Sequence, residues 1–142
     1  MENQTRMTPI NVDSVVREIQ NAKSILLTTH KQCDGDGLGA ILGLYYALKK
    51  LGKPVRILTV DEVPAKYHFL NFSDFLERFD EDHKEIEQTD LALIFDTNDQ
   101  RLVEPLFSKL TSACSRVLFV DHHPILNQGP IPNAGSFIDT QA

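Results

Sequence analysis

Four short aliphatic runs limit this chain to a small number of folds. They cover residues 24–29, 55–60, 91–95 and 116–120 and are rich in Ile, Val, Leu and Phe. Each run is nearly continuous instead of alternating with polar residues, which is typical of parallel strands whose two faces are both covered. Strands of this kind require helices on both sides of the sheet, because neither face can be left in water.

Helix-length segments separate these runs. Residues 11–22 place four aliphatic side chains on one stripe, with Asn11 as N-cap. Residues 38–51 repeat apolar positions at helical spacing and stop at Gly52. A third helix is expected over residues 101–112, and Pro105 favours a true start of the helix at this proline. The alternation predicts an α/β fold with a doubly wound, mostly parallel sheet flanked by helices.

Two further segments are assigned by composition. Residues 67–79 contain five aromatic side chains and are interpreted as an amphipathic segment that buries its rings. From Pro124 onward, Pro, Gly and Asn predict a loop that ends in a short strand over residues 136–138.

Length and charge restrict the class of protein. A chain of 142 residues buries about two-thirds of its unfolded surface, so residues 1–142 can form one domain without metal or disulfide support. The net charge of -6 argues against a protein that binds nucleic acid through a generally basic surface. Cys33 and Cys114 are far apart, which fits a reducing compartment, and no apolar run reaches the roughly 18 residues of a membrane span. We therefore expect a cytoplasmic domain with no membrane association.

Polar side chains follow three of the four runs. They are His30, Asp34 and Asp36 after the first run, Asp96 and Asp99 after the third, and Asp121, His122 and His123 after the fourth. Parallel strands end at one edge of the sheet, so we expect these groups to converge there. Carboxylate and imidazole ligands suit Mn²⁺, Mg²⁺, Fe²⁺ or Zn²⁺, and a pair of such ions can clamp a phosphoryl group. Gly35, Gly37 and Gly39 are expected to allow a sharp turn and a close approach of the backbone to a ligand.

Each of these residues also has an ordinary structural interpretation, as a helix cap, a turn residue or a buried histidine. Their coincidence at neighbouring strand ends favours the metal site. One alternative is a dinucleotide-binding site, with Gly35 and Gly37 before a helix and Asp61 after the next strand. This interpretation is disfavoured because carboxylates would lie against the pyrophosphate with no metal between them. Another alternative is a phosphoacceptor receiver domain, but this function gives no role to the residues Asp121-His122-His123.

The three polar segments together resemble a known superfamily. The motifs are His30-x-x-x-Asp34-Gly35-Asp36-Gly37-x-Gly39-Ala40, then Asp96-Thr97-Asn98-Asp99-x-Arg101, then Asp121-His122-His123. In this order they resemble the motifs of the DHH phosphoesterases, which include nanoRNase/pAp phosphatases, single-strand DNA exonucleases, cyclic-dinucleotide phosphodiesterases and manganese pyrophosphatases. The nanoRNase/pAp phosphatase branch is the one we favour.

The resemblance implies a role for each motif residue. His30 and Asp34 would bind one metal, Asp36 and His122 the second, and Asp96 would bridge the two. The implied cofactor is a pair of Mn²⁺ ions, with Mg, Co, Fe or Zn as alternatives. Asp96, His122 and His123 would form the catalytic group, with His123 on the substrate phosphate and Asp121 orienting a ligand histidine. Asp99 and Arg101 are interpreted either as substrate-binding groups or as a helix cap and ion pair, and Cys33 as a neutral buried thiol.

These assignments imply a metal-dependent phosphoester hydrolase, with a hydroxide bridging two metals as nucleophile. The expected substrate is a phosphorylated nucleotide or a short single-stranded oligonucleotide, and a homodimer is compatible with the sequence. Relatives usually add a further aspartate and a substrate-binding domain after the histidine pair, whereas Ala142 follows closely here and Asp139 is not taken as a replacement. We therefore expect a domain incomplete at its C-terminal end. The alternative is a truncated metal- or nucleotide-binding module with impaired catalysis.

Overall fold

A computed structural model describes residues 12–79, 86–121 and 137–138. The strands are β1 Ile25–Thr29, β2 Val55–Thr59, β3 Leu76–Arg78, β4 Thr89–Phe95, β5 Cys114–Asp121 and β6 Phe137–Ile138. The helices are α1 Val12–Asn21, α2 Gly35–Lys50 and α3 Leu106–Ala113, with short 3₁₀ helices η2 Ala65–Leu70 and η3 Gln100–Val103. The strands form one sheet in the order β3-β2-β1-β4-β5-β6, and every pairing in it is parallel.

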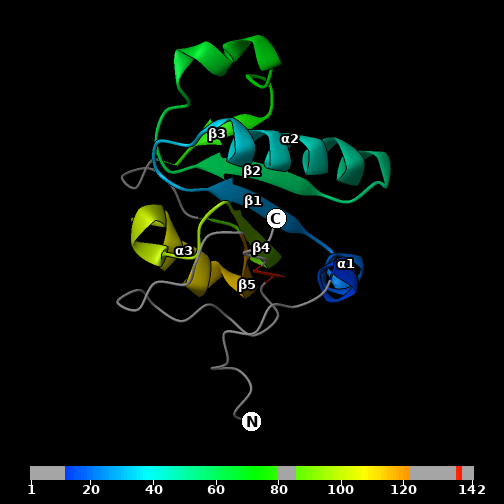
Figure 1. Cartoon of the computed structure of the whole chain (residues 1–142). Coiled ribbons are helices and arrows are strands. Elements are labelled where there is room, and N and C mark those ends of the chain that lie inside the picture. The colour runs from blue at the N-terminus through cyan, green and yellow to red at the C-terminus, as the bar shows by residue number, and fades with distance from the viewer. Residues whose placement is uncertain (1–11, 80–85, 122–136, 139–142) are drawn as a thin grey trace.

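The strand order reverses between β1 and β4, which lie side by side in the middle of the sheet (Figure 1). In doubly wound sheets, ligands bind at this reversal, beyond the carboxyl ends of the strands. The register pairs Thr29 with Phe95, so the residues that follow, His30 and Asp96, leave the sheet next to each other. The predicted fold class is confirmed, and the fold brings two of the predicted site residues together.

The aliphatic runs are buried because both sheet faces are covered. Every residue of β1 is buried, as are most residues of β4. On one face, Leu27 and Leu93 pack with α2 residues such as Ile41, and Ile19 of α1 joins this cluster. On the other face, Leu26 and Ile94 pack with α3 and η3. The sheet is thus a rigid central layer that holds the strand ends in place.

Helix boundaries mostly follow the prediction. Helix α2 begins at Gly35, three residues before the expected start at residue 38, because the side chain of Asp34 caps it. The segment over residues 101–112 is divided at Pro105 into η3 and α3, and the predicted start of the helix at this proline is confirmed. The predicted stop at Gly52 is confirmed by its left-handed φ of 79°.

The aromatic segment is more structured than expected. It contains η2 and, in addition, the edge strand β3, which was not predicted because Leu76 is only partly buried and Glu77 and Arg78 are exposed. The short strand expected over residues 136–138 is confirmed as β6. Asn11, the proposed cap of α1, lies outside the described residues. Among the residues that the structure describes, no helix is long and apolar enough to cross a lipid bilayer.

Candidate metal centre

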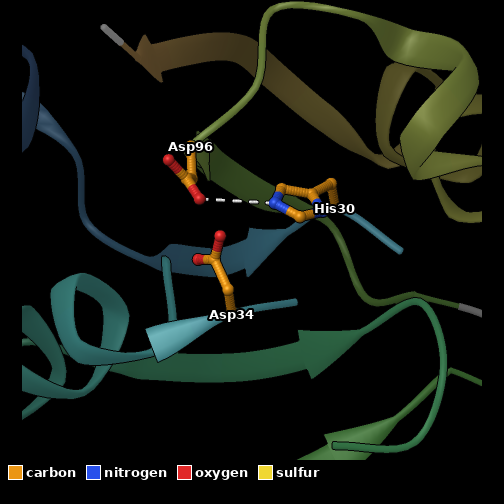
Figure 2. Close-up of side chains that lie close together, drawn as sticks. All are labelled: His30, Asp34 and Asp96. Atoms are coloured by element: carbon orange, nitrogen blue, oxygen red, sulfur yellow. Dashed lines mark hydrogen bonds and ion pairs between the residues drawn. The ribbon is translucent and has the colours of Figure 1, made fainter. Parts of the chain in front are cut away.

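Three predicted ligands converge at the carboxyl edge of the sheet. His30 follows β1, Asp34 precedes α2 and Asp96 follows β4 (Figure 2). Each offers one ligand atom, and these atoms all lie within 4.8 Å of one another. One imidazole nitrogen and two carboxylate oxygens at this spacing form a donor set that fits a divalent cation such as Mn²⁺ or Zn²⁺.

The ring of His30 is oriented for ligation. Its Nδ1 lies 2.5 Å from the carbonyl oxygen of Lys31, and a carbonyl can only accept, so Nδ1 carries the proton. In the neutral ring, Nε2 then presents a lone pair, 3.3 Å from Oδ2 of Asp96. Two lone pairs facing each other at this distance require a cation or a proton between them. A hydrogen bond from the far ring nitrogen to a backbone carbonyl is the usual support of a metal-ligating histidine.

The backbone of Asp96 is held in an unusual conformation. Its φ of 70° lies in the left-handed region, and its side chain is largely buried. The Asp96 N–H donates to the carbonyl of Val120 at 2.9 Å, which extends the β4–β5 pairing by one residue. Left-handed φ costs about 1–2 kcal/mol for most residues and less for Asp. This conformation, together with the interstrand hydrogen bond, turns the carboxylate towards His30 and Asp34.

Asp34 combines two roles at the start of α2. Its Oδ1 accepts a hydrogen bond from the backbone N–H of Gly37 at 3.2 Å. Burial acts to raise the pKa of Asp34, but this hydrogen bond, another shared with Asp96, and the nearby His30 ring hold the pKa below its ordinary value. Asp34 therefore stays ionised beside a second carboxyl group, a pairing that a bound cation would stabilise. The cap interpretation and the ligand interpretation are compatible.

Of the three glycines, only Gly37 stands where a side chain has no room. A Cβ at Gly37 would lie 2.5 Å from Oγ1 of Thr29 and 3.2 Å from Cβ of Asp96. A Cβ at Gly39 would meet nothing within 4 Å, and one at Gly35 would make ordinary contacts. Packing within the protein therefore requires glycine only at Gly37, and the close approach of the backbone to a ligand stays a prediction. Thr29, whose hydroxyl donates to the carbonyl of Phe95 at 2.7 Å, is a supporting residue that the sequence did not reveal.

Asp99 and Arg101 are both cap and ion pair. The buried Asp99 carboxylate accepts from the backbone N–H of Arg101 at 3.0 Å and from its Nε and Nη2 at 2.9 and 2.8 Å. The hydrogen bond from the Arg101 side chain is the main reason that the pKa of Asp99 is lowered. Both structural interpretations left open by the sequence are confirmed. The Arg101 side chain remains more than half exposed.

Cys33 lies in the loop between β1 and α2, and Asp61, which follows β2, binds this loop. Burial, and then the charges of Asp61 and Asp34, raise the pKa of the Cys33 thiol to about 11, so the predicted neutral buried thiol is confirmed. The Asp61 carboxylate accepts from the backbone N–H of Gln32 at 3.1 and 3.2 Å. Asp61 is thus committed to holding the loop, and not to a ribose as the dinucleotide alternative required.

Of the remaining predicted ligands, the structure describes only Asp36, which is not part of the cluster. Asp36 is exposed in the first turn of α2, and within the described part of the chain the group of ligands contains only His30, Asp34 and Asp96. The backbone of Asp121 ends β5, the neighbour of β4, but its side chain is not described. His122 and His123 lie outside the described residues.

A parallel doubly wound sheet with imidazole and carboxylate ligands at its reversal defines an α/β protein with a candidate metal centre. Comparison of the chain with known protein families and structures shows which family it belongs to. Residues 24–141 match the model of the DHH family, N-terminal domain. The chain belongs to this family, which confirms the resemblance carried by the three motifs.

Two relatives illustrate the match. The chain is 26% identical over 130 residues to the bifunctional oligoribonuclease and PAP phosphatase NrnA of Mycoplasma genitalium, covering 91% of this chain and 39% of that protein. An exopolyphosphatase-related protein from Bacteroides fragilis has the same fold, with a TM-score of 0.76 at 20% identity over 92% of this chain and 38% of its own. The chain therefore spans about two-fifths of the length of these relatives.

Proposed function

We propose that this chain is the catalytic core of a divalent-metal-dependent phosphoester hydrolase that acts on short oligonucleotides or phosphonucleotides. The convergence of His30, Asp34 and Asp96 within 4.8 Å at the sheet reversal is the observation that carries the proposal. Membership of the DHH family and similarity to a protein named as an oligoribonuclease and PAP phosphatase support the same chemistry.

The proposed centre holds two cations, with Mn²⁺ as the first choice. His30 and Asp34 would hold one, Asp36 and His122 the other, and Asp96 would contact both. When bound, such ions make water nucleophilic at neutral pH and neutralise charge on a phosphoryl group. The donor set fits this role, because hard carboxylate oxygens are combined with a histidine whose tautomer is set by the Lys31 carbonyl.

The protein's own contribution is positioning. The left-handed backbone and burial of Asp96 hold its carboxylate rigidly, so little reorganisation is needed when a cation and substrate arrive. Arg101, fixed by two side-chain hydrogen bonds to Asp99 at the same sheet edge, is proposed to face the substrate phosphate with the rest of its guanidinium. His123 is proposed as a second phosphate contact, and Asp121 as the residue that orients a ligand histidine.

The test is hydrolysis of a 5′-phosphorylated dinucleotide and of 3′-phosphoadenosine 5′-phosphate by the 142-residue chain in Mn²⁺. Asp96→Asn is the informative variant, because Asn tolerates the left-handed φ of 70° and retains the size of the side chain. We expect Asp96→Asn to abolish turnover and weaken Mn²⁺ binding in calorimetry, with an unchanged circular dichroism spectrum. Asp13→Asn, an exposed acid on α1, is the matched control and should behave as wild type.

Undiminished hydrolysis by Asp96→Asn would refute the assignment. Mn²⁺ binding without turnover of either substrate in the wild-type chain would instead support the alternative of a binding module with impaired catalysis. The two outcomes are separated because calorimetry reports binding independently of hydrolysis.

A further inference from the structure

The peptide group between Lys31 and Gln32 is hydrogen-bonded on both of its sides. Its carbonyl oxygen, which belongs to Lys31, lies 2.5 Å from Nδ1 of His30. Its N–H, which belongs to Gln32, donates to the two carboxylate oxygens of Asp61 at 3.2 and 3.1 Å. A single peptide group therefore connects a carboxylate that follows β2 with the ring of a candidate metal ligand.

The geometry of a trans peptide makes this connection directional. Its C=O and N–H bonds point in opposite directions, so a negative charge at the N–H polarises the group and makes the carbonyl oxygen a stronger acceptor. A stronger acceptor at Lys31 holds the Nδ1 proton of His30 more tightly, and Nε2 then keeps the lone pair that a metal requires. Figure 2 shows Nε2 of His30 on the side of the ring that faces Asp96.

The loop that contains this peptide group is held from both sides of β1. Gln32 has a left-handed φ of 54°, a conformation that is costly for a residue of this kind. Asp61 holds the loop from the β2 side, and the N–H of Lys31 donates to the carbonyl of Leu102 in η3 at 2.8 Å. Because β2 and β4 flank β1 in the sheet, these two anchors give the Lys31 carbonyl a fixed direction.

Asp61 is placed to act on the metal centre without being one of its ligands. It does not belong to the cluster of His30, Asp34 and Asp96. Both of its carboxylate oxygens instead accept from the same N–H, that of Gln32, and the residue is only partly exposed. A hydrogen bond to an ionised carboxylate is roughly twice as strong as one to a neutral oxygen, so the charge of Asp61 is the property that matters here.

We propose that Asp61 is a positioning residue of the metal centre, which acts on His30 by polarising the Lys31–Gln32 peptide group. The polarised carbonyl fixes the Nδ1–H form of the ring, so that His30 presents Nε2 to a divalent cation. Ligand histidines often donate directly to a carboxylate, and here one peptide group is inserted between the two. The inference rests on the proposed function and deepens it, because it adds a residue that contacts neither metal nor substrate.

The first test measures the tautomer of His30 in the metal-free chain. Long-range ¹H–¹⁵N correlation spectra distinguish the Nδ1–H form of a neutral imidazole ring from the Nε2–H form. Asp61→Asn keeps an oxygen that can accept from the Gln32 N–H but removes the negative charge. Polarisation strengthens a hydrogen bond by about 10–30%, so we expect the ratio of Nε2–H to Nδ1–H forms to rise by about 2- to 20-fold in Asp61→Asn.

Glu62→Gln is the matched control. Glu62 is the exposed residue directly after Asp61, so its replacement removes one negative charge from the same strand end. The tautomer ratio in Glu62→Gln should equal that of wild type. Equal ratios in wild type and Asp61→Asn would overturn the inference. Equal changes in the Asp61 and Glu62 variants would also overturn it, because the effect would then come from net charge and not from the hydrogen-bonded peptide group.

A second variant separates polarisation of the peptide group from simple support of the backbone. Glycine adopts a left-handed φ without strain, so Gln32→Gly would restore the loop in the Asp61→Asn background if backbone support were the whole role of Asp61. We expect the double variant to keep the altered tautomer ratio of Asp61→Asn. Recovery of the wild-type ratio would show that Asp61 only holds the backbone, which contradicts the inference.

Calorimetry with Mn²⁺ separates the inference from the proposed function. Asp61→Asn should weaken Mn²⁺ binding by about 10-fold, as for other groups that support a ligand histidine, and Glu62→Gln should bind as wild type. Unchanged Mn²⁺ affinity in Asp61→Asn, with hydrolysis by the wild-type chain, would overturn the inference and leave the proposed function standing. A wild-type chain that binds no Mn²⁺, with a His30 tautomer that depends on Asp61, would refute the proposed function and support the connection from Asp61 to His30.

Discussion

Replacing Gly37 by alanine should damage the metal centre from a position that binds no metal. The new Cβ would lie 2.5 Å from Oγ1 of Thr29 and 3.2 Å from Cβ of Asp96. A contact of 2.5 Å is closer than these atoms can tolerate, so Thr29 or the start of α2 must move. The Thr29 hydroxyl would then lose its 2.7 Å hydrogen bond to the Phe95 carbonyl, directly before Asp96.

The expected magnitude follows from three opposing effects. Overpacking costs about 1–3 kcal/mol, and loss of the Thr29 hydrogen bond costs about 1 kcal/mol. Alanine in place of glycine within a helix recovers about 1 kcal/mol of helix propensity. We therefore expect Gly37→Ala to lower the free energy of unfolding by about 1–3 kcal/mol. Because the new Cβ also crowds Cβ of Asp96, Mn²⁺ affinity should fall by about 10- to 100-fold, as for other residues that support ligands.

Urea unfolding gives the stability change and calorimetry gives the Mn²⁺ affinity. Gly39→Ala is the matched control, since its Cβ would meet nothing within 4 Å in the same helix, and it should be neutral or stabilise by up to about 1 kcal/mol. A Thr29→Ala change in the Gly37→Ala background removes the clashing oxygen and should recover part of the loss. Equal stability and equal Mn²⁺ affinity in the Gly37 and Gly39 variants would show that the close contact has no consequence.

Two further predictions concern ionisation. Because the hydrogen bond from Arg101 lowers the pKa of Asp99, ionised Asp99 contributes stability that is fully present above its ordinary pKa of 3.8 and is lost as pH falls through the lower folded value. Urea unfolding of Asp99→Asn should therefore show a flatter loss of stability below about pH 4 than wild type, and an identical acid limb would contradict it. Burial raises the pKa of the Cys114 thiol from 9.0 to about 11, so in a Cys33→Ser background its labelling by a disulfide reagent near pH 8 should be about a hundredfold slower than in urea. Labelling at the same rate with and without urea would refute the latter prediction.

The fold was largely predictable because its strands are buried on both faces. A strand such as β1 leaves no position for charged residues, so the nearly continuous apolar run predicts it directly. Strand β3 has no apolar run in the sequence, because it lies at the sheet edge and Glu77 and Arg78 are exposed. The start of the third helix at Pro105 was predictable, because proline fits the first turn of a helix and interrupts a helix interior.

The metal ligands were predictable for a different reason. In a parallel sheet the residues after each strand share one edge, so knowledge of the strands is enough to place His30 and Asp96 together. The supporting groups were not predictable in this way. The sequence pattern does not distinguish Gly35, Gly37 and Gly39 from one another. Only Gly37 has no room for a side chain, because the ends of β1 and β4 approach the first turn of α2 there. Similarly, the hydrogen bond from Thr29 to Phe95 depends on strand register.

The sequence by itself determined the α/β class, the DHH family motifs and the kinds of ligand that gather at the sheet edge, because buried strands and strand-end residues are local patterns. Only the tertiary structure decided the left-handed backbone of Asp96, the 3.3 Å approach of His30 Nε2 to Asp96 Oδ2, and the lack of room for a side chain at Gly37. These features depend on contacts between segments far apart in the chain, and such contacts are formed only when the sheet and its covering helices have packed.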